Sequence, residues 1–512
     1  MNLRWILKAT FLVLVSTSAP IEAQEESTIP STEAPEQCRR VRKDWDVLTP
    51  TEKNTYKRAI AAAMDSGAYI KFVEIHTEMQ VEMEAHRTCM FCYWHRLLLV
   101  VFENMLRAQG PEFACVTLPY VNFVGAHDRV LAGTCSSLGD CLPILRELGG
   151  YTTGSQQTVN INGQEVSGRC ATESPLDHFC QSGDVSGEDC VRCVPRSNWG
   201  VAEVPASASF ASLREQIFSG QNIGQMSPLI EQGCHNNIHA NLEGVMNTFA
   251  APADPIFWSL HTMIDLFHVI FHKCRVGTEI LTFDQKAAHP IAWTSCPKRN
   301  GGVFQPTDRI VMRTGVAGRN KINATDDPVI GRYFEGVPDQ YAGLMDARDL
   351  GSGNSYSYEI RGHISELYVN CDRPTPATPI PDGDRRKLVA KTDKNIVEMV
   401  TQETKCDEEK QVSAWYDKTM DYLGGQTPEA MADLERQVCM YEEECQGGTH
   451  EYSAEFQATW GSKQPRCLTI VKAIKRGKME MMHANWRQDM EIYFGCPKPA
   501  NATRSRCSAK KH

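Results

Sequence analysis

The stretch from Cys234 to Cys274 carries five histidines on two predicted helices, and this spacing limits what the chain can fold into. His235 and His239 are four residues apart, so on a helix both imidazoles leave the same face, one turn apart. Asp254-Pro255 predicts the start of a second helix, because Asp caps free amides and Pro suits the first helical position. That helix carries His261. Three imidazoles from two facing helices can hold one metal ion.

A second group of three histidines lies upstream and consists of His76, His86 and His95. The segment from Phe91 to Leu106 is apolar on nearly every face, which predicts a buried helix with His95 in its first turns. Two such groups predict a pair of metal ions, each held by three neutral imidazoles. Imidazole suits copper, zinc, iron and nickel. The Glu-x-x-His pattern of di-iron bundles and the His-Glu-x-x-His pattern of zinc proteases are both absent, so copper fits best.

Both segments resemble the copper A and copper B signatures of the tyrosinase family of type-3 copper proteins. The first has a Phe-x-x-Trp-His-Arg context around His95, and the second reads Asp-Pro-Ile-Phe-Trp-Ser-Leu-His-x-x-x-Asp from Asp254 to Asp265. The resemblance covers roughly residues 40 to 370. It implies a mainly α fold with an antiparallel four-helix bundle that holds two copper ions, with O₂ as co-substrate. It assigns copper A to His76, His86 and His95, and copper B to His235, His239 and His261.

The same resemblance points to two residues beside the ligands. Glu231 and Asn236 match positions that hold a water in some family members, where that water is proposed to deprotonate the incoming phenol. A phenol has a pKa near 10 and must bind copper as phenolate, so a water oriented by a carboxylate could take that proton. The alternative for Glu231 is a charge at a helix N-terminus or on the surface.

Other positions have weaker family counterparts. Phe249 lies in the loop where the family often narrows the substrate entrance, and Asp265 is either structural or supports a group near the metal. The family's Tyr-x-Tyr corresponds to Tyr356 and Tyr358, which would pair with an arginine such as Arg42. We favour the alternative that they do not.

Four further histidines are not expected to bind metal. His268 and His272 have ligand-like spacing, but a histidine on an apolar helix is more often a hydrogen-bonded core residue. His127 and His178 fall in predicted loops and are expected at the surface.

Composition and the first residues predict an exported protein. The 512 residues carry a net charge of −10 without a large basic block, which excludes nucleic acid and anionic membranes as expected partners. Arg4 and Lys8 precede an apolar run from Ala9 to Val15 that is too short to span a membrane. We therefore predict a signal peptide at 1–23, with a short buried helix as the alternative. A disordered lead should follow at 24–40.

Twenty cysteines in an exported chain predict disulfides. Fourteen lie between Cys38 and Cys371 and six between Cys406 and Cys507, so each half could close its own bridges. Cys-x-x-Cys pairs at 89–92 and 190–193 have zinc spacing, but disulfides are favoured in this compartment. Asn323-Ala-Thr and Asn501-Ala-Thr are glycosylation sequons.

The chain divides by composition into a copper-binding domain at 41–371, a Pro-rich linker at 372–394 and a helical Cys-rich C-terminal module at 395–512. In the first domain, a capping box at 49–52 begins a helix that should reach about Asp65. Residues 125–205 are expected to be long disulfide-pinned loops.

The resulting hypothesis is a secreted, extracellular tyrosinase that hydroxylates monophenols and oxidises o-diphenols to o-quinones. Its substrates would be small phenols or protein tyrosyl groups, and its products would form melanin-like pigment or cross-link proteins, with the extracellular matrix as a further partner. It is most similar to the secreted tyrosinases of invertebrate shell or cuticle. Two alternatives stay open: a catechol oxidase only, or a copper- and O₂-binding matrix protein without turnover. The C-terminal module could cover the copper cleft until it is removed, or bind matrix.

Overall fold

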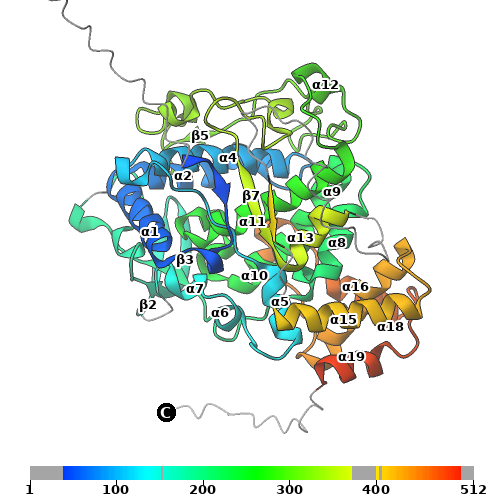
Figure 1. Cartoon of the computed structure of the whole chain (residues 1–512). Helices are drawn as coiled ribbons and strands as arrows, with labels where there is room; N and C mark the ends of the chain where they lie inside the picture. The colour runs from blue at the N-terminus through cyan, green and yellow to red at the C-terminus, as the bar shows by residue number, and fades with distance from the viewer. Residues whose placement is uncertain (1–37, 151–153, 186, 372–398, 403–405, 497–512) are drawn as a thin grey trace, which may run out of the picture. The chain divides into compact units, whose positions relative to one another are not determined.

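The computed structural model describes residues 38–150, 154–185, 187–371, 399–402 and 406–496, and these are mainly helical, as predicted (Figure 1). The expected signal peptide, most of the lead, the linker and the second sequon lie outside the described residues. The helices of the first domain that bear on the site are α1 Pro50–Asp65, α2 Ala68–Thr77, α3 Met79–Ala85, α4 Phe91–Arg107, α5 Phe123–Leu131, α8 Phe210–Phe218, α9 Ile223–Ile230, α10 Asn236–Leu242, α11 Ile256–Phe271 and α13 Gly362–Asn370.

Helices α4 and α11 lie at the centre of the core, with α2 beside α4 and α8 beside α11. Almost every residue of α4 is buried, as its apolar residues on all faces predict. Phe102 of α4 stacks on Trp258 of α11 with ring centroids 3.5 Å apart. The predicted capping box is present at the start of α1, where Thr49 and Glu52 hydrogen-bond reciprocally.

The start of α11 is fixed by Asp254, as predicted, although the helix itself begins two residues later. Its Oδ1 accepts from the N–H of Ile256 at 3.1 Å. The same carboxylate accepts hydrogen bonds from Nε and Nη2 of Arg196, at 2.7 and 2.8 Å. Arg196 also donates to the carbonyls of Leu148 and Gly150. This buried ion pair ties the helix that carries His261 to the strand β4 (Val194–Arg196).

The prediction of unstructured loops over 125–205 was wrong in part. Strands β2 (Gln156–Ile161), β3 (Gln164–Ala171) and β4 form an antiparallel sheet, with Ile161 paired to Gln164 across a two-residue turn. That turn is Asn162-Gly163, and both residues have positive φ, at 43° and 89°. Asn-Gly is the strongest short hairpin signal, so the sequence contained this information.

A second sheet joins three segments that are far apart in the sequence. Strand β7 (Ser357–Arg361) lies between β1 (Val41–Arg42) and β8 (Val400–Gln402), and both pairings are parallel. The smallest sheet pairs β5 (Arg313–Thr314) with β6 (Ile322–Asn323), where the exposed Asn323 of the first sequon lies.

Most cysteines form disulfides, as predicted, but Cys92 and Cys234 are buried free thiols. The even count of fourteen in the first half permitted complete pairing, but these two cysteines stay unpaired. Neither Cys-x-x-Cys pair can hold a metal ion as a pair of thiolates, because Cys89 bonds Cys296, Cys190 bonds Cys180 and Cys193 bonds Cys170. Cys92 alone of these four is a free thiol. Bridges 135–141, 274–371, 439–467 and 445–496 complete the set whose geometry is described.

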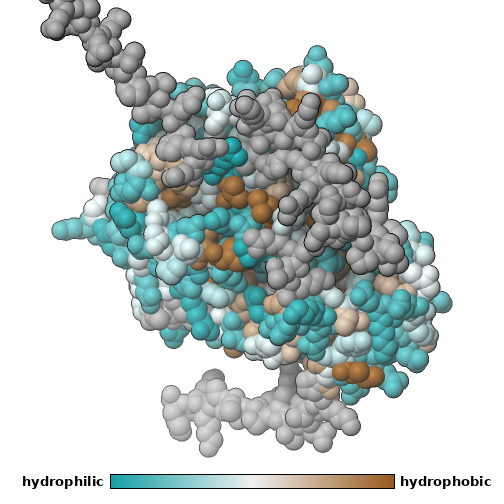
Figure 2. All heavy atoms as spheres, viewed as in Figure 1, coloured by the Kyte–Doolittle hydropathy of each residue, from teal (hydrophilic) through white to brown (hydrophobic). Residues whose placement is uncertain are grey.

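The C-terminal segment is helical, as predicted, and contains α15 Asp407–Tyr422, α16 Pro428–Cys445, α17 Ala454–Trp460, α18 Arg466–Lys475 and α19 Trp486–Phe494. We call residues 399–402 and 406–496 the tail. Its hydrophobic core includes Ala206 and Ala211 of the first domain, and the domain boundary itself stays a prediction. The face of the tail that Figure 2 shows is mostly hydrophilic, with a small hydrophobic patch over α19. No helix in the described part of the chain is long and apolar enough to cross a membrane.

Candidate metal centre

Three elements bring His76, His86 and His95 together. His76 lies in the last turn of α2, His86 directly follows α3, and His95 lies in the first turns of α4. One ligand atom from each falls within 4.8 Å of the others. His76 Nδ1 bonds the carbonyl of Phe249 at 2.7 Å, and His95 Nδ1 bonds that of Phe91 at 2.9 Å. The carbonyls place the proton on Nδ1 and leave Nε2 with a lone pair.

His235, His239 and His261 form a second group with the same spacing. His235 ends a π-helical turn (Glu231–His235) that runs into α10, which carries His239, and His261 comes from α11. His239 Nδ1 bonds the carbonyl of Met246 at 2.6 Å, and His235 Nδ1 bonds Asn236 Oδ1 at 2.8 Å. All six expected ligands are thus gathered in two triads.

The two triads face each other. The rings of His95 and His261 stack with centroids 4.3 Å apart, and those of His86 and His235 are 6.2 Å apart. The triads therefore belong to one centre that can accommodate two adjacent ions.

Burial is the main cause that lowers the pKa of every one of the six imidazoles. The pKa falls to about 3 for His76 and to about 4 for His239, and lies well below its usual range for the other four. The six rings are neutral at pH 7, as metal ligands must be. Nε2 of all six lacks a hydrogen-bond partner within the described part of the chain, although an unsatisfied buried polar atom costs free energy. An all-imidazole set of buried lone pairs fits copper.

Glu231 and Asn236 both lie beside the triads. Glu231 is buried, and its Oε1 accepts from the N–H of Arg87 at 2.6 Å, the residue after His86. Its Oε2 has no partner among the described residues. Burial raises the pKa of Glu231 to about 8. Asn236 orients His235 and donates from Nδ2 to Ser462 at 2.5 Å.

Asp265 does not contact the triads. It accepts from Arg96 Nε at 2.7 Å and from the hydroxyls of Tyr356 and Tyr358, both at 2.6 Å. Arg42 donates to Asp265 and Tyr358, and its guanidinium lies 3.6 Å from the ring centre of Tyr356. The pairing of the two tyrosines with Arg42, which we disfavoured from sequence, is present. This cluster joins α4, α11, β1 and β7 behind His95.

The four other histidines lie outside the triads. His268 on α11 and His272, which begins the π-helical turn His272–Val276 after that helix, are both buried and belong to the core, as expected. His127 was expected at the surface, but it is buried on α5. A local pattern predicted a loop there and missed the helix. His178 is partly exposed and bonds Asp65 at 2.8 Å.

Sequence reasoning missed the residue that covers the centre. Trp460, at the end of α17, is almost fully buried, and its ring lies 5.0 Å from His86, 5.1 Å from His239 and 5.9 Å from His235. Its Nε1 donates to the carbonyl of Asn247 at 2.9 Å. Phe249, expected near the entrance, packs against this ring at 5.2 Å. The tail therefore places an indole over both triads.

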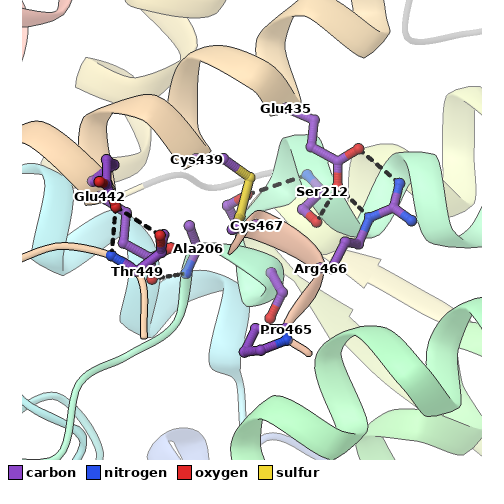
Figure 3. Close-up of a disulfide and its surroundings, with 12 residues drawn as sticks. Ala206, Ser212, Glu435, Cys439, Glu442, Thr449, Pro465, Arg466 and Cys467 are labelled. Carbon is purple, nitrogen blue, oxygen red and sulfur yellow. Dashed lines mark hydrogen bonds and ion pairs between the residues drawn. A yellow bond between two sulfur atoms is a disulfide. The ribbon is translucent and has the colours of Figure 1, made fainter. Parts of the chain in front are cut away.

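The rest of the tail is held by buried acids on α16 (Figure 3). Glu435 accepts from the hydroxyl of Ser212 at 2.6 Å, and Glu442 accepts from the N–H of Ala206 at 3.0 Å. Arg466 donates twice to Glu435, and the disulfide between Cys439 and Cys467 joins α16 to α18. No bridge of described geometry links the tail to the first domain.

Residues 66–273 match the family model for the common central domain of tyrosinase. The tyrosinase of Streptomyces glaucescens is 28% identical over 260 residues, which is 47% of this chain and 85% of that protein. The tyrosinase of Streptomyces antibioticus is 29% identical over 240 residues, 44% of this chain and 80% of that protein. Among solved structures, a polyphenol oxidase of Thermothelomyces thermophila has a TM-score of 0.39 and 15% identity, and covers 62% of this chain and 88% of its own.

Proposed function

Since this chain belongs to the tyrosinase family through the central domain at residues 66–273, we propose that it hydroxylates monophenols and oxidises the resulting o-diphenols to o-quinones. The observation that carries this proposal is the pair of buried neutral histidine triads, whose facing rings approach to 4.3 Å. His76, His86 and His95 would hold one copper ion, and His235, His239 and His261 the other. Bound copper supplies the one-electron couples and the O₂ site that a phenol oxidase needs.

The residues of the chain do the remaining work in this proposal. Phe249 and the neighbouring aromatic rings exclude water and orient the phenol ring above the triads. Glu231 in its ionised form, through a water, takes the proton from the phenol hydroxyl, because its Oε2 is buried next to the first triad and has no partner among the described residues. A pKa of about 8 leaves this form a minority at pH 7, and bound copper would lower that pKa because a nearby cation favours the carboxylate. Asn236 keeps His235 in the tautomer that leaves Nε2 available, and its amide becomes available to hold that water once Ser462 leaves.

Purified protein loaded with copper and cleaved in the linker, with the uncleaved protein alongside, would be assayed for O₂-dependent quinone formation from L-tyrosine and from L-DOPA. Oxidation of both supports the proposal, whereas oxidation of L-DOPA alone identifies a catechol oxidase. An O₂-dependent absorption band without quinone would identify a binding protein without turnover. Asn236→Ala and Glu231→Gln should reduce the rate with L-tyrosine more than that with L-DOPA.

We further propose that the tail keeps the centre closed in the full chain. Trp460 occupies the space above His86 and His239 that a phenol ring would need. The described bridges of the tail both lie within it. After cleavage in the linker, non-covalent contacts, including the pairing of β7 with β8, would therefore retain the tail. Cleavage that leaves activity unchanged would contradict this role.

We also propose that the protein is exported and acts outside the cell on small phenols or protein tyrosyl groups, giving pigment or cross-linked matrix. The disulfides described here support an oxidising compartment. Sequencing the N-terminus of the secreted protein would test the predicted cleavage after residue 23.

A further inference from the structure

A cleft of about 680 Å³ opens beside the centre, between the first domain and the tail. Arg87, Glu231 and Gln232 line it from one side, and Gly461 and Lys463 line it from the other. Arg87 directly follows His86, and Gly461 directly follows Trp460. The cleft is therefore lined by the residues that directly follow a triad histidine and the covering tryptophan.

The tail backbone lies directly on the Arg87 side chain. Gly461 has a φ of 63°, and a Cβ added there would come within 2.5 Å of Arg87 Nη1 and 2.9 Å of its Cδ. Glycine adopts this φ readily, whereas a Cβ here would be strained and would force either the loop or the Arg87 side chain to shift. Because Gly461 directly follows Trp460, the guanidinium of Arg87 lies against the backbone one residue along the chain from the indole that covers the triads. That spacing matches the distance between the ring and the carboxylate of an aromatic amino acid.

Charge at the cleft favours an anion. Arg87 Nη2 donates to Glu82 at 3.1 Å, and Arg299 Nη1 donates to the same Oε1 at 2.8 Å. The guanidinium groups of Arg87 and Arg299 share the buried carboxylate of Glu82, so these three side chains together carry one net positive charge. About a third of the Arg87 side chain is exposed, at 32%. The hydrogen bond from the N–H of Arg87 to Glu231 holds the Arg87 backbone in place directly after His86.

We propose that Arg87 is a specificity-determining residue that binds the carboxylate of phenols such as aromatic amino acids and phenylpropanoic acids. The phenol ring then occupies the place of the Trp460 indole, and the carboxylate replaces the backbone at Gly461. This inference rests on the proposed function for its biological meaning. An Arg–carboxylate pair is charge-assisted and two-pronged, which separates carboxylated phenols from neutral and cationic ones of equal size.

The test uses the full chain carrying Trp460→Ala, which removes the covering ring, and Gly461→Ala, which strains the loop because alanine rarely adopts the φ of 63° found there. Binding of 3-phenylpropanoate and of neutral 3-phenylpropanol would be measured by calorimetry, so no turnover is required. We expect the carboxylate to bind about tenfold more tightly, as a charged hydrogen bond allows. Adding Arg87→Gln should abolish the difference, and Arg87→Lys should restore part of it.

Arg309→Gln is the matched control, because Arg309 is exposed, pairs with Asp339 and does not line the cleft. It should leave the selectivity and the unfolding midpoint unchanged. Equal affinity for the two ligands in the opened chain, or a preference that survives Arg87→Gln, would overturn the inference. In parallel, Arg87→Gln in the same opened chain should raise the ratio of the KM for L-DOPA to the KM for 4-methylcatechol. Failure to oxidise 4-methylcatechol at all would instead count against the proposed function.

Discussion

Replacing Glu442 by Gln should make retention of the tail less dependent on pH. Glu442 lies on α16 with its side chain buried, and its described contact to the first domain is the N–H of Ala206, at 3.0 Å. Burial is the largest cause that raises the pKa of Glu442, to about 8, and the negative charges of Glu203 and Glu443 act in the same direction. The Ala206 N–H lowers the pKa only in part. The docked tail therefore holds this carboxyl protonated at neutral pH.

The magnitude follows from linkage. In the released tail Glu442 returns to water and to its ordinary pKa of 4.5, whereas the docked form keeps a pKa of about 8. Because the pKa of Glu442 is higher in the docked form than in the released form, its contribution to docking is complete below pH 4.5. That contribution is lost as the pH rises towards 8. Within this window docking weakens about tenfold, or about 1.4 kcal/mol, for each pH unit. Between pH 5 and pH 7 this amounts to roughly a hundredfold.

Neighbouring groups change the total slope in known directions. Burial also raises the pKa of Glu203, which adds to the effect, and nearby His450 opposes that rise. Glu443 behaves in the opposite way: although burial alone would raise its pKa, contacts with Lys475 and Thr449 lower it to about 2. Glu443 is therefore ionised throughout the window and does not contribute to the slope.

The assay is the fraction of tail that stays bound after cleavage at a protease site inserted behind Gly383, measured by size-exclusion chromatography from pH 5 to pH 8. The unmodified chain should release fragment 384–512 increasingly as the pH rises. Glu442→Gln should retain more of it at pH 7 and 8, with a slope lower by one proton. Glu455→Gln changes an exposed acid on the tail and should behave like the parent. Identical pH profiles for the parent and Glu442→Gln would refute the reasoning.

Three further changes test other parts of the structure. Asp265→Asn should lower the free energy of unfolding in urea by about 3–5 kcal/mol, because it leaves two buried guanidinium groups without their shared charge. Gly461→Ala in the full chain should raise activity on a diphenol, since alanine is strained at the φ of 63° and its Cβ would lie 2.5 Å from Arg87 Nη1 unless the loop or that side chain moves; unchanged latency would count against the tail's role. Cys92 and Cys234, whose thiol pKa burial raises to about 12, should react with a thiol reagent only after denaturation.

The ligand set was predictable because it depends on short spacings within helices. His235 and His239 come from one helix, and the caps at Thr49 and Asp254 were visible as residue types at fixed offsets. The hairpin at Asn162 was equally local and was overlooked. In these cases a few neighbouring residues determine the backbone.

Contacts between distant segments could not be predicted in this way. Nothing in the sequence around Trp460 indicates that it lies on His86, because that contact depends on how α16 and α17 dock. The free thiols of Cys92 and Cys234 escaped prediction because an even number of cysteines permits complete pairing without requiring it. The cluster of Arg42 with Tyr356 and Tyr358 likewise depends on the parallel pairing of β1 with β7, which residue types alone do not specify.

The chemistry of the covering residue explains how the centre can be closed without losing its ligands. Trp460 has a single hydrogen-bond donor and uses it on the carbonyl of Asn247, so it offers the histidines only a ring face. The Nε2 atoms of His86 and His239 beneath it remain without a partner among the described residues. A side chain with a lone pair would compete with a metal ion for the triads, whereas an indole competes only with another aromatic ring. In the closure proposed above, the tail would therefore block the phenol and not the metal, and closure would be compatible with a loaded centre.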